Sequence, residues 1–128
     1  MMRNKKALAG CAILALLLMS SPGEAAEFCN RVGRYHLNNA GPWPMHIAAH
    51  PGTTCEATFG SYGTGDLVFK RLLVVMAPTR GKIRLREGGY YIYTAPSGAG
   101  TDSFTLRVCG SEGGQDGCAD LQYSVTVQ

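Results

Sequence analysis

The chain has 128 residues, among them 12 basic and nine acidic ones. Three of the basic residues and one acidic residue lie in the first 25, so the other 103 residues carry a formal charge of only +1. So small a charge argues against the strongly basic surface of a nucleic-acid-binding domain, and 103 residues are enough for one domain with a small core.

Residues 1–25 have the three parts of a cleaved secretory signal peptide. Basic residues begin it, an apolar run covers residues 7–19, and small residues precede a cleavage site after Ala25. The apolar run is shorter than the ~20 residues of a membrane-spanning helix. A lipidation signal ending at Cys11 is a second hypothesis, although the apolar run continues past that cysteine. We therefore expect an exported protein, periplasmic or secreted, with no transmembrane segment in the mature chain.

The rest of the chain predicts a single all-β domain over residues 26–128. Short runs of β-branched and aromatic residues alternate with Gly and Pro clusters, and no segment has the apolar spacing of a long helix. Residues 26–65 form an N-terminal segment with the first strands. The elements expected there and just after are strands at 34–37, 54–59 and 67–69, loops at 38–44 and 60–65, and a bulge at Lys70–Arg71.

Residues 66–128 form the main sheet region. Residues 72–76 are apolar on both faces, which predicts a central strand covered on both sides. Residues 82–86 alternate with Ile83 and Leu85 facing inward, and glycines then predict a tight hairpin turn into a strand at 90–94. The last strand is expected at 121–127, with its odd-numbered residues facing inward.

From about residue 74 to residue 127 the sequence resembles the bacterial immunoglobulin-like or cadherin-like repeats of surface and secreted proteins. Those repeats show Pro-x-x-Gly, a Gly turn, Tyr-Thr-x-Pro and then Gly-x-Asp-x-Phe before a final strand. The matching residues are Pro78, Gly81, Gly88, Gly89, Tyr93, Thr94, Pro96, Gly100, Asp102 and Phe104. The resemblance implies an immunoglobulin-like antiparallel β-sandwich that binds other molecules.

Within this pattern, Pro96 is expected to end a strand, and Gly98 and Gly100 are expected to cross between sheets with positive φ. Asp102 is expected to accept backbone N–H groups of its own loop. In calcium-dependent relatives such aspartates join acidic clusters, but no second acidic residue stands near Asp102 in this sequence. Tyr93 is expected to be buried against Phe104 or Tyr123 with its hydroxyl hydrogen-bonded.

Four cysteines lie beyond the signal peptide, and an even number in an exported chain predicts two disulfides. Phe104 and alternate residues after it face the core, which places Cys109 on the outer face, and the same reasoning places Cys118 outward on the last strand. These phases predict Cys109–Cys118 and leave Cys29–Cys55 as the second pair. Residues 110–117 would then form a clamped recognition loop.

One candidate metal set stands out, and no catalytic set does. Its members are His36, Met45, His46 and His50. Imidazole and thioether ligands suit copper, and imidazole suits zinc, so a periplasmic metal-binding protein is the alternative function. Solvent-exposed loop histidines are the simpler interpretation, because prolines crowd this segment. Nucleophile and zinc-hydrolase motifs are missing, so we expect no enzyme and no cofactor.

Two features favour binding. Lys82, Arg84 and Arg86 leave one face of a strand and Arg80 precedes it, which suits an acidic polymer or membrane surface or else guards a sheet edge. Trp43 is either a plug beneath a loop or an exposed anchor. The leading hypothesis is therefore a non-enzymatic interaction module for a protein or envelope component, with oligomeric state left open.

Overall fold

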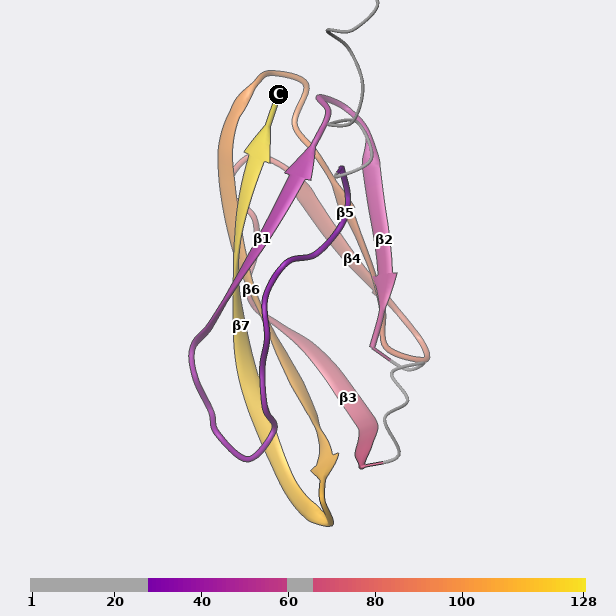
Figure 1. Cartoon of the computed structure of the whole chain (residues 1–128). Coiled ribbons are helices and arrows are strands. Elements are labelled where there is room, and N and C mark those ends of the chain that lie inside the picture. Colours follow the sequence, from indigo (N-terminus) through magenta and orange to yellow (C-terminus); the bar gives the residue numbers. More distant parts are fainter. Residues whose placement is uncertain (1–27, 60–65) are drawn as a thin grey trace, which may run out of the picture.

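The computed structural model describes residues 28–59 and 66–128. These residues form seven strands and no helix (Figure 1), which confirms the all-β prediction. The strands are β1 (Trp43–Ala49), β2 (Thr54–Thr58), β3 (Leu67–Met76), β4 (Lys82–Arg86), β5 (Tyr90–Thr94), β6 (Gly100–Glu112) and β7 (Gln115–Val127). The predicted signal peptide and the predicted loop at 60–65 lie outside the described residues. Within those residues no helix is long and apolar enough to cross a bilayer.

The strands form two sheets that share one core. One sheet has the order β1-β7-β6-β3 and the other the order β2-β5-β4. β1 runs parallel to β7, whereas the remaining pairs are antiparallel. Inward side chains of both sheets belong to a single apolar cluster. The arrangement is therefore sandwich-like, with polar residues alternating outward as expected for sheets covered on one face.

The hairpin of β4 and β5 agrees with the sequence prediction. Residues 87–89 make the turn, with Gly88 and Gly89 at φ values of 85° and 80°, which residues with a Cβ rarely adopt. Ile83 and Leu85 are partly buried against the core, while the basic residues between them are exposed. Of the described strands β4 pairs only with β5, so it is a terminal strand of the smaller sheet.

The prediction of a recognition loop at residues 110–117 is wrong, because these residues continue the ladder between β6 and β7. Gly110 pairs with Gly117, and only Gly113 and Gly114 turn the chain, with φ values of 59° and 82°. The paired glycines serve a close approach instead, since a Cβ on Gly110 or Gly117 would collide with the backbone of Val68 or of residue 37. Gly110 and Gly117 are therefore strand residues that allow close packing, and they do not indicate a loop.

The prediction of a strand at 34–37 is also wrong, and the first strand, β1, begins at the end of the loop predicted at 38–44 and continues to Ala49. Residues 33–36 carry no strand, whereas β1 runs from Trp43 with Met45, Ile47 and Ala49 buried on its inner face. Pro44 is tolerated because β1 is a terminal strand of its sheet. Met45, Ile47 and Ala49 alternate as in a strand, but the neighbouring prolines are typical of loops and therefore argued against a strand here.

The core centres on stacked aromatic rings from both sheets. Tyr93 is fully buried and stacks on Phe104 with ring centroids 5.2 Å apart, and Phe104 stacks on Tyr123 at 4.5 Å. The Tyr93 hydroxyl donates to Asp102 over 2.7 Å. The prediction of a buried, hydrogen-bonded Tyr93 is confirmed, and the stack joins the sheet of β5 to that of β6 and β7.

Both predicted disulfides are present. Cys109 and Cys118 lie directly opposite each other in the β6–β7 ladder, with Cα atoms 4.0 Å apart. This follows from the turn at residues 113 and 114, which sets the register of the whole hairpin. Cys29 bonds to Cys55 in β2, and its backbone N–H donates to the Ala48 carbonyl of β1 over 2.7 Å.

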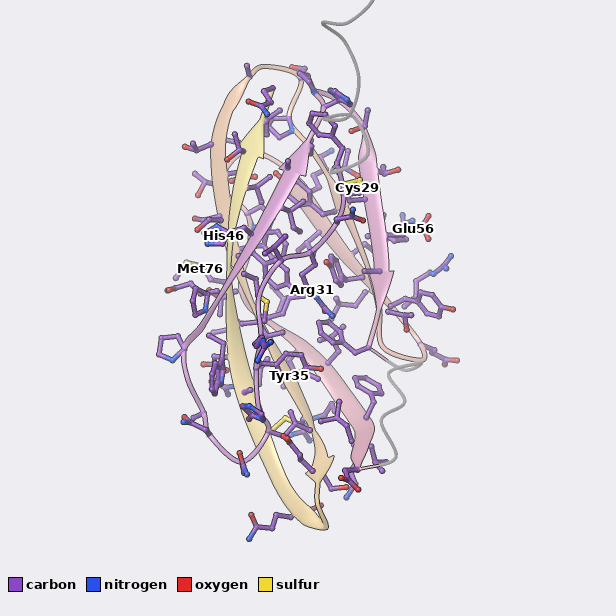
Figure 2. The ribbon with its side chains drawn as sticks, viewed as in Figure 1. Cys29, Arg31, Tyr35, His46, Glu56 and Met76 are labelled. Atoms are coloured by element: carbon purple, nitrogen blue, oxygen red, sulfur yellow. A yellow bond between two sulfur atoms is a disulfide. The ribbon has the colours of Figure 1, made fainter. Side chains whose placement is uncertain are left out.

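Cys29 therefore ties the ends of both sheets together on one side of the molecule. Figure 1 shows the N-terminal segment running between β1 and β2, and Figure 2 shows Cys29 beside β2. Val32 and His46 exchange backbone hydrogen bonds of 3.0 and 2.9 Å, which covers the outer edge of β1. Because the sheets face each other, the terminal strands β3 and β4 lie on the opposite side, joined by residues 77–81. We call these the closed side and the open side.

The prediction of a covered central strand at residues 72–76 is wrong. These residues belong to β3, which among the strands of residues 28–59 and 66–128 pairs only with β6 and ends its sheet. The predicted bulge is confirmed by a register shift between Phe69 and Arg71, and a second shift lies between Val74 and Met76. Leu67, Phe69 and Leu72 still pack against the core, but the four residues that follow them are exposed.

Candidate functional site

The Gly-x-Asp-x-Phe motif is part of the scaffold. Asp102 is 7% exposed and accepts backbone N–H groups of Thr79, Arg80 and Gly81 over 2.8 to 3.1 Å. It also accepts the Ser103 N–H and the Tyr93 hydroxyl. The expectation that Asp102 caps its own loop is thus corrected, because most of its donors belong to the turn between β3 and β4.

The electrostatics of Asp102 agree with a structural role. Burial alone would raise the pKa of its carboxyl, but the Tyr93 hydroxyl and the backbone N–H groups hold the pKa below its usual value. Burial, together with the bond to Asp102, raises the pKa of the Tyr93 phenol. The carboxylate is ionised and its oxygens are already occupied by donors, so it holds the turn in place.

Arg80 belongs to the same turn and not to the basic row. Its guanidinium donates to the carbonyls of Gly98, Ala99 and Thr101 over 3.1 to 3.4 Å. A Cβ on Gly100, whose φ is 138°, would lie 2.6 Å from the Arg80 Nη1 atom. Gly98 has no positive φ, which corrects that expectation. Arg80 therefore clamps the crossing between the sheets.

The other three cations form a row along the β4 edge. Lys82, Arg84 and Arg86 are exposed. Arg86 lies 3.8 Å from Glu56 of β2, and its guanidinium also stacks over the Tyr90 ring at 5.3 Å. The Glu56 side chain projects away from the domain in Figure 2. A shallow hollow of about 260 Å³ lies beside Lys82 and Arg84. Because β4 ends its sheet, charges along it oppose pairing with another strand, and they are also exposed to an acidic partner.

The structure does not bring the four candidate metal ligands together. Met45 is fully buried in the core, and His46 is exposed on the other face of β1. The Nδ1 atom of His36 lies 2.9 Å from Glu112, and that of His50 lies 3.0 Å from the Gln128 carbonyl. In the described part of the chain, no three His, Cys, Asp or Glu side chains are placed to share a metal ion.

Trp43 is a plug and not an exposed anchor. It is partly buried against the core, and its indole N–H donates to the Asn39 carbonyl over 2.8 Å. The His36 ring meets it edge-on at 5.6 Å. Trp43 thus fixes the loop that leads into β1.

The feature that sequence reasoning missed is the β3 edge, by which we mean Leu73, Val74, Val75 and Met76. Their exposed fractions are 39%, 39%, 47% and 59%. Met76 projects from the rim of the domain in Figure 2. A terminal strand presents unpaired backbone groups, and here they are bordered by apolar side chains with no charge among them. Such an edge is suited to pair with another strand.

The phase break at Lys70–Arg71 was the sequence signal that β3 is an edge strand, because bulges are common at sheet edges.

Comparison of the chain with protein-family models, curated proteins and solved structures finds no match.

Proposed function

We propose that this protein is an exported, non-enzymatic, immunoglobulin-like interaction domain that binds a protein partner through the β3 edge. The observation that carries the proposal is the exposure of four consecutive apolar residues on a terminal strand. Folded proteins usually protect such edges with charges, prolines, bulges or covering segments. β3 has two register shifts, but its last four residues carry no charge and no proline. An unprotected edge is a binding surface when a partner strand completes the sheet, with backbone hydrogen bonds giving affinity and side chains giving specificity.

The strand order supports the immunoglobulin-like assignment. The three-stranded sheet β2-β5-β4 corresponds to strands B, E and D of that fold, and β7-β6-β3 corresponds to G, F and C. β1 differs from the usual first strand because it lies parallel beside β7. Neither disulfide joins the two sheets in the antibody manner, since one lies within a hairpin and the other ties the N-terminal segment to β2.

Two further observations support export and a role without catalysis. Two disulfides are typical of an oxidising compartment, in agreement with the predicted signal peptide. Among the described residues, the carboxyls whose pKa values are lowered all serve structural bonds: Asp102 in the turn, Asp120 with Arg107, and Glu112 with His36. These groups are used for holding strands and loops together.

Site-specific photocrosslinking in living cells tests the proposal. A photoreactive phenylalanine analogue replaces Val75 on the β3 edge, and in matched controls it replaces Arg84 on β4 or Gln122 on the outer face of β7, both exposed. We expect one reproducible protein adduct from position 75 that is lost when Met76→Lys is added. Equal adducts from all three positions, or adducts from the control positions alone, would reject the β3 edge.

A further inference from the structure

The charges around the β3 edge specify its partner further, and this inference rests on the proposed function. The strand reads LVFKRLLVVM and contains two cations and no carboxylate. Lys70 is neutralised by Asp116, 2.9 Å away. Arg71 is exposed and donates to the Cys109 sulfur over 3.6 Å, but the described residues offer it no ion pair.

The register of β3 places Arg71 on the outer face of the sheet, directly beside the apolar run. Arg71 pairs with Cys109 and Leu73 pairs with Arg107, while Leu72 pairs with the inward-facing Val108. Arg107 is already bound by Asp120, with 2.7 Å between Nε and Oδ1. Arg71 is therefore the cation in this region that still lacks a carboxylate.

The outer face of the sheet is hollowed beside Arg71. This hollow of about 440 Å³ lies over β3, β6 and β7 and is bordered by Lys70, Arg71, Asp116 and the Cys109–Cys118 disulfide. A strand added to β3 would place one of its residues opposite Arg71 with the side chain on the same face, at the ~5 Å Cβ separation of cross-strand neighbours. A carboxylate at that position would neutralise Arg71.

We infer that the partner supplies an extended segment with apolar residues opposite Leu72–Met76 and an Asp or Glu opposite Arg71, and that it belongs to a different protein. A second copy of this chain fits less well. Because residues 72–78 contain no carboxylate, antiparallel pairing of the Leu72–Met76 runs of two β3 strands leaves both copies of Arg71 without an ion pair. Because β3 and β4 both lie on the open side, such a dimer would also bring the two β4 edges, each with three cations, toward each other.

Four labelled synthetic peptides test this inference. Each has a five-residue Val/Ile core with Ser-Gly ends, and a Glu or a Lys directly before or directly after the core. The two placements cover parallel and antiparallel pairing. Fluorescence anisotropy measures binding to the purified protein, to Arg71→Glu and to the matched control Arg84→Glu, which makes the same charge change on the other edge.

We expect the protein and Arg84→Glu to bind one Glu peptide about threefold or more tightly than its Lys counterpart, and Arg71→Glu to invert this preference. Thermal unfolding of each variant confirms that it is folded. Binding without a Glu/Lys preference would overturn the charge inference and leave strand addition standing. Binding of no peptide by any variant would overturn strand addition itself. A dimer of the protein alone that Val75→Lys dissociates would identify a second copy as the partner.

Discussion

The two edges of the open side differ in one property that decides what each can do. Both β3 and β4 end a sheet, and both leave one row of backbone groups without a strand partner in the described part of the chain. β4 places Lys82, Arg84 and Arg86 along its edge, whereas the final four residues of β3 are apolar and exposed. Charges on an edge oppose strand pairing, and their absence permits it. The comparison shows that edge position alone does not define a binding strand, and that the side chains on the edge decide.

The largest expected effect on stability comes from removing the disulfide that holds the closed side together. Replacing Cys29 and Cys55 by serine removes the link that closes β1 against β2, and the chain-entropy model predicts a loss of about 3.6 kcal/mol in the free energy of unfolding. The matched change at Cys109 and Cys118 should cost about 2.7 kcal/mol, because its loop is shorter. Urea unfolding measures both. A smaller loss for the Cys29–Cys55 change would show that the N-terminal segment is held by its other contacts.

The second effect concerns the turn that joins the two edges. Tyr93→Ala removes a fully buried ring and leaves Asp102 without its hydroxyl donor, so we expect a loss of about 3 kcal/mol. Tyr90→Ala is the control, because Tyr90 is 39% exposed on the same strand and should cost far less. Similar losses in urea melts would contradict the aromatic stack as the link between the sheets.

The pH dependence of stability tests the same turn more gently. Because the pKa of Asp102 is lower in the folded protein than in the unfolded chain, its contribution is fully present above about pH 4. The contribution is lost as the pH falls through the lower, folded-state value. Asp102→Asn should therefore be less stable at pH 7 and approach the parent protein in acid. Parallel pH curves between pH 7 and pH 2 would argue against an ionised Asp102 in the turn.

The smallest effects on stability come from exchanging the chemistry of the two edges. Val75→Lys with Met76→Lys changes exposed side chains, so the free energy of unfolding should move by no more than about 0.5 kcal/mol while partner binding is lost. Lys82→Val with Arg84→Val should likewise leave stability nearly unchanged but promote self-association. Light scattering and chemical denaturation measure the two properties separately. A β4 variant that stays monomeric would show that its cations are not what protects that edge.

The sequence predicted those parts of the fold that depend on local patterns. Alternation located β4, β5 and the second half of β7, and side-chain phase selected both disulfides. The burial of Tyr93 followed from its place in an alternating strand. These features depend on residues close together in the chain or on which face of a strand a side chain occupies.

The candidate site was not predictable in the same way. Residues 72–76 are apolar on both faces, and that pattern is shared by a central strand and by an edge strand that binds a partner. Only long-range pairing distinguishes the two, because β3 pairs with β6 some 30 residues later and, among the described strands, with no other. β1 escaped prediction for a related reason, since its partner is the last strand of the chain.

The parallel pairing of β1 with β7 also governs when the domain can be completed. Trp43 pairs with Leu121 and Ala49 with Val127, so the four-stranded sheet joins residues near both ends of the described chain. A ribosome produces β1 long before β7, and pairing between distant segments is slow to form. β1 must therefore wait without its strand partner until β7 has been synthesised. A chain shortened before β7 would leave β1 without its strand partner and β6 paired with β3 alone, so the four-stranded sheet cannot be completed without this thirteen-residue strand.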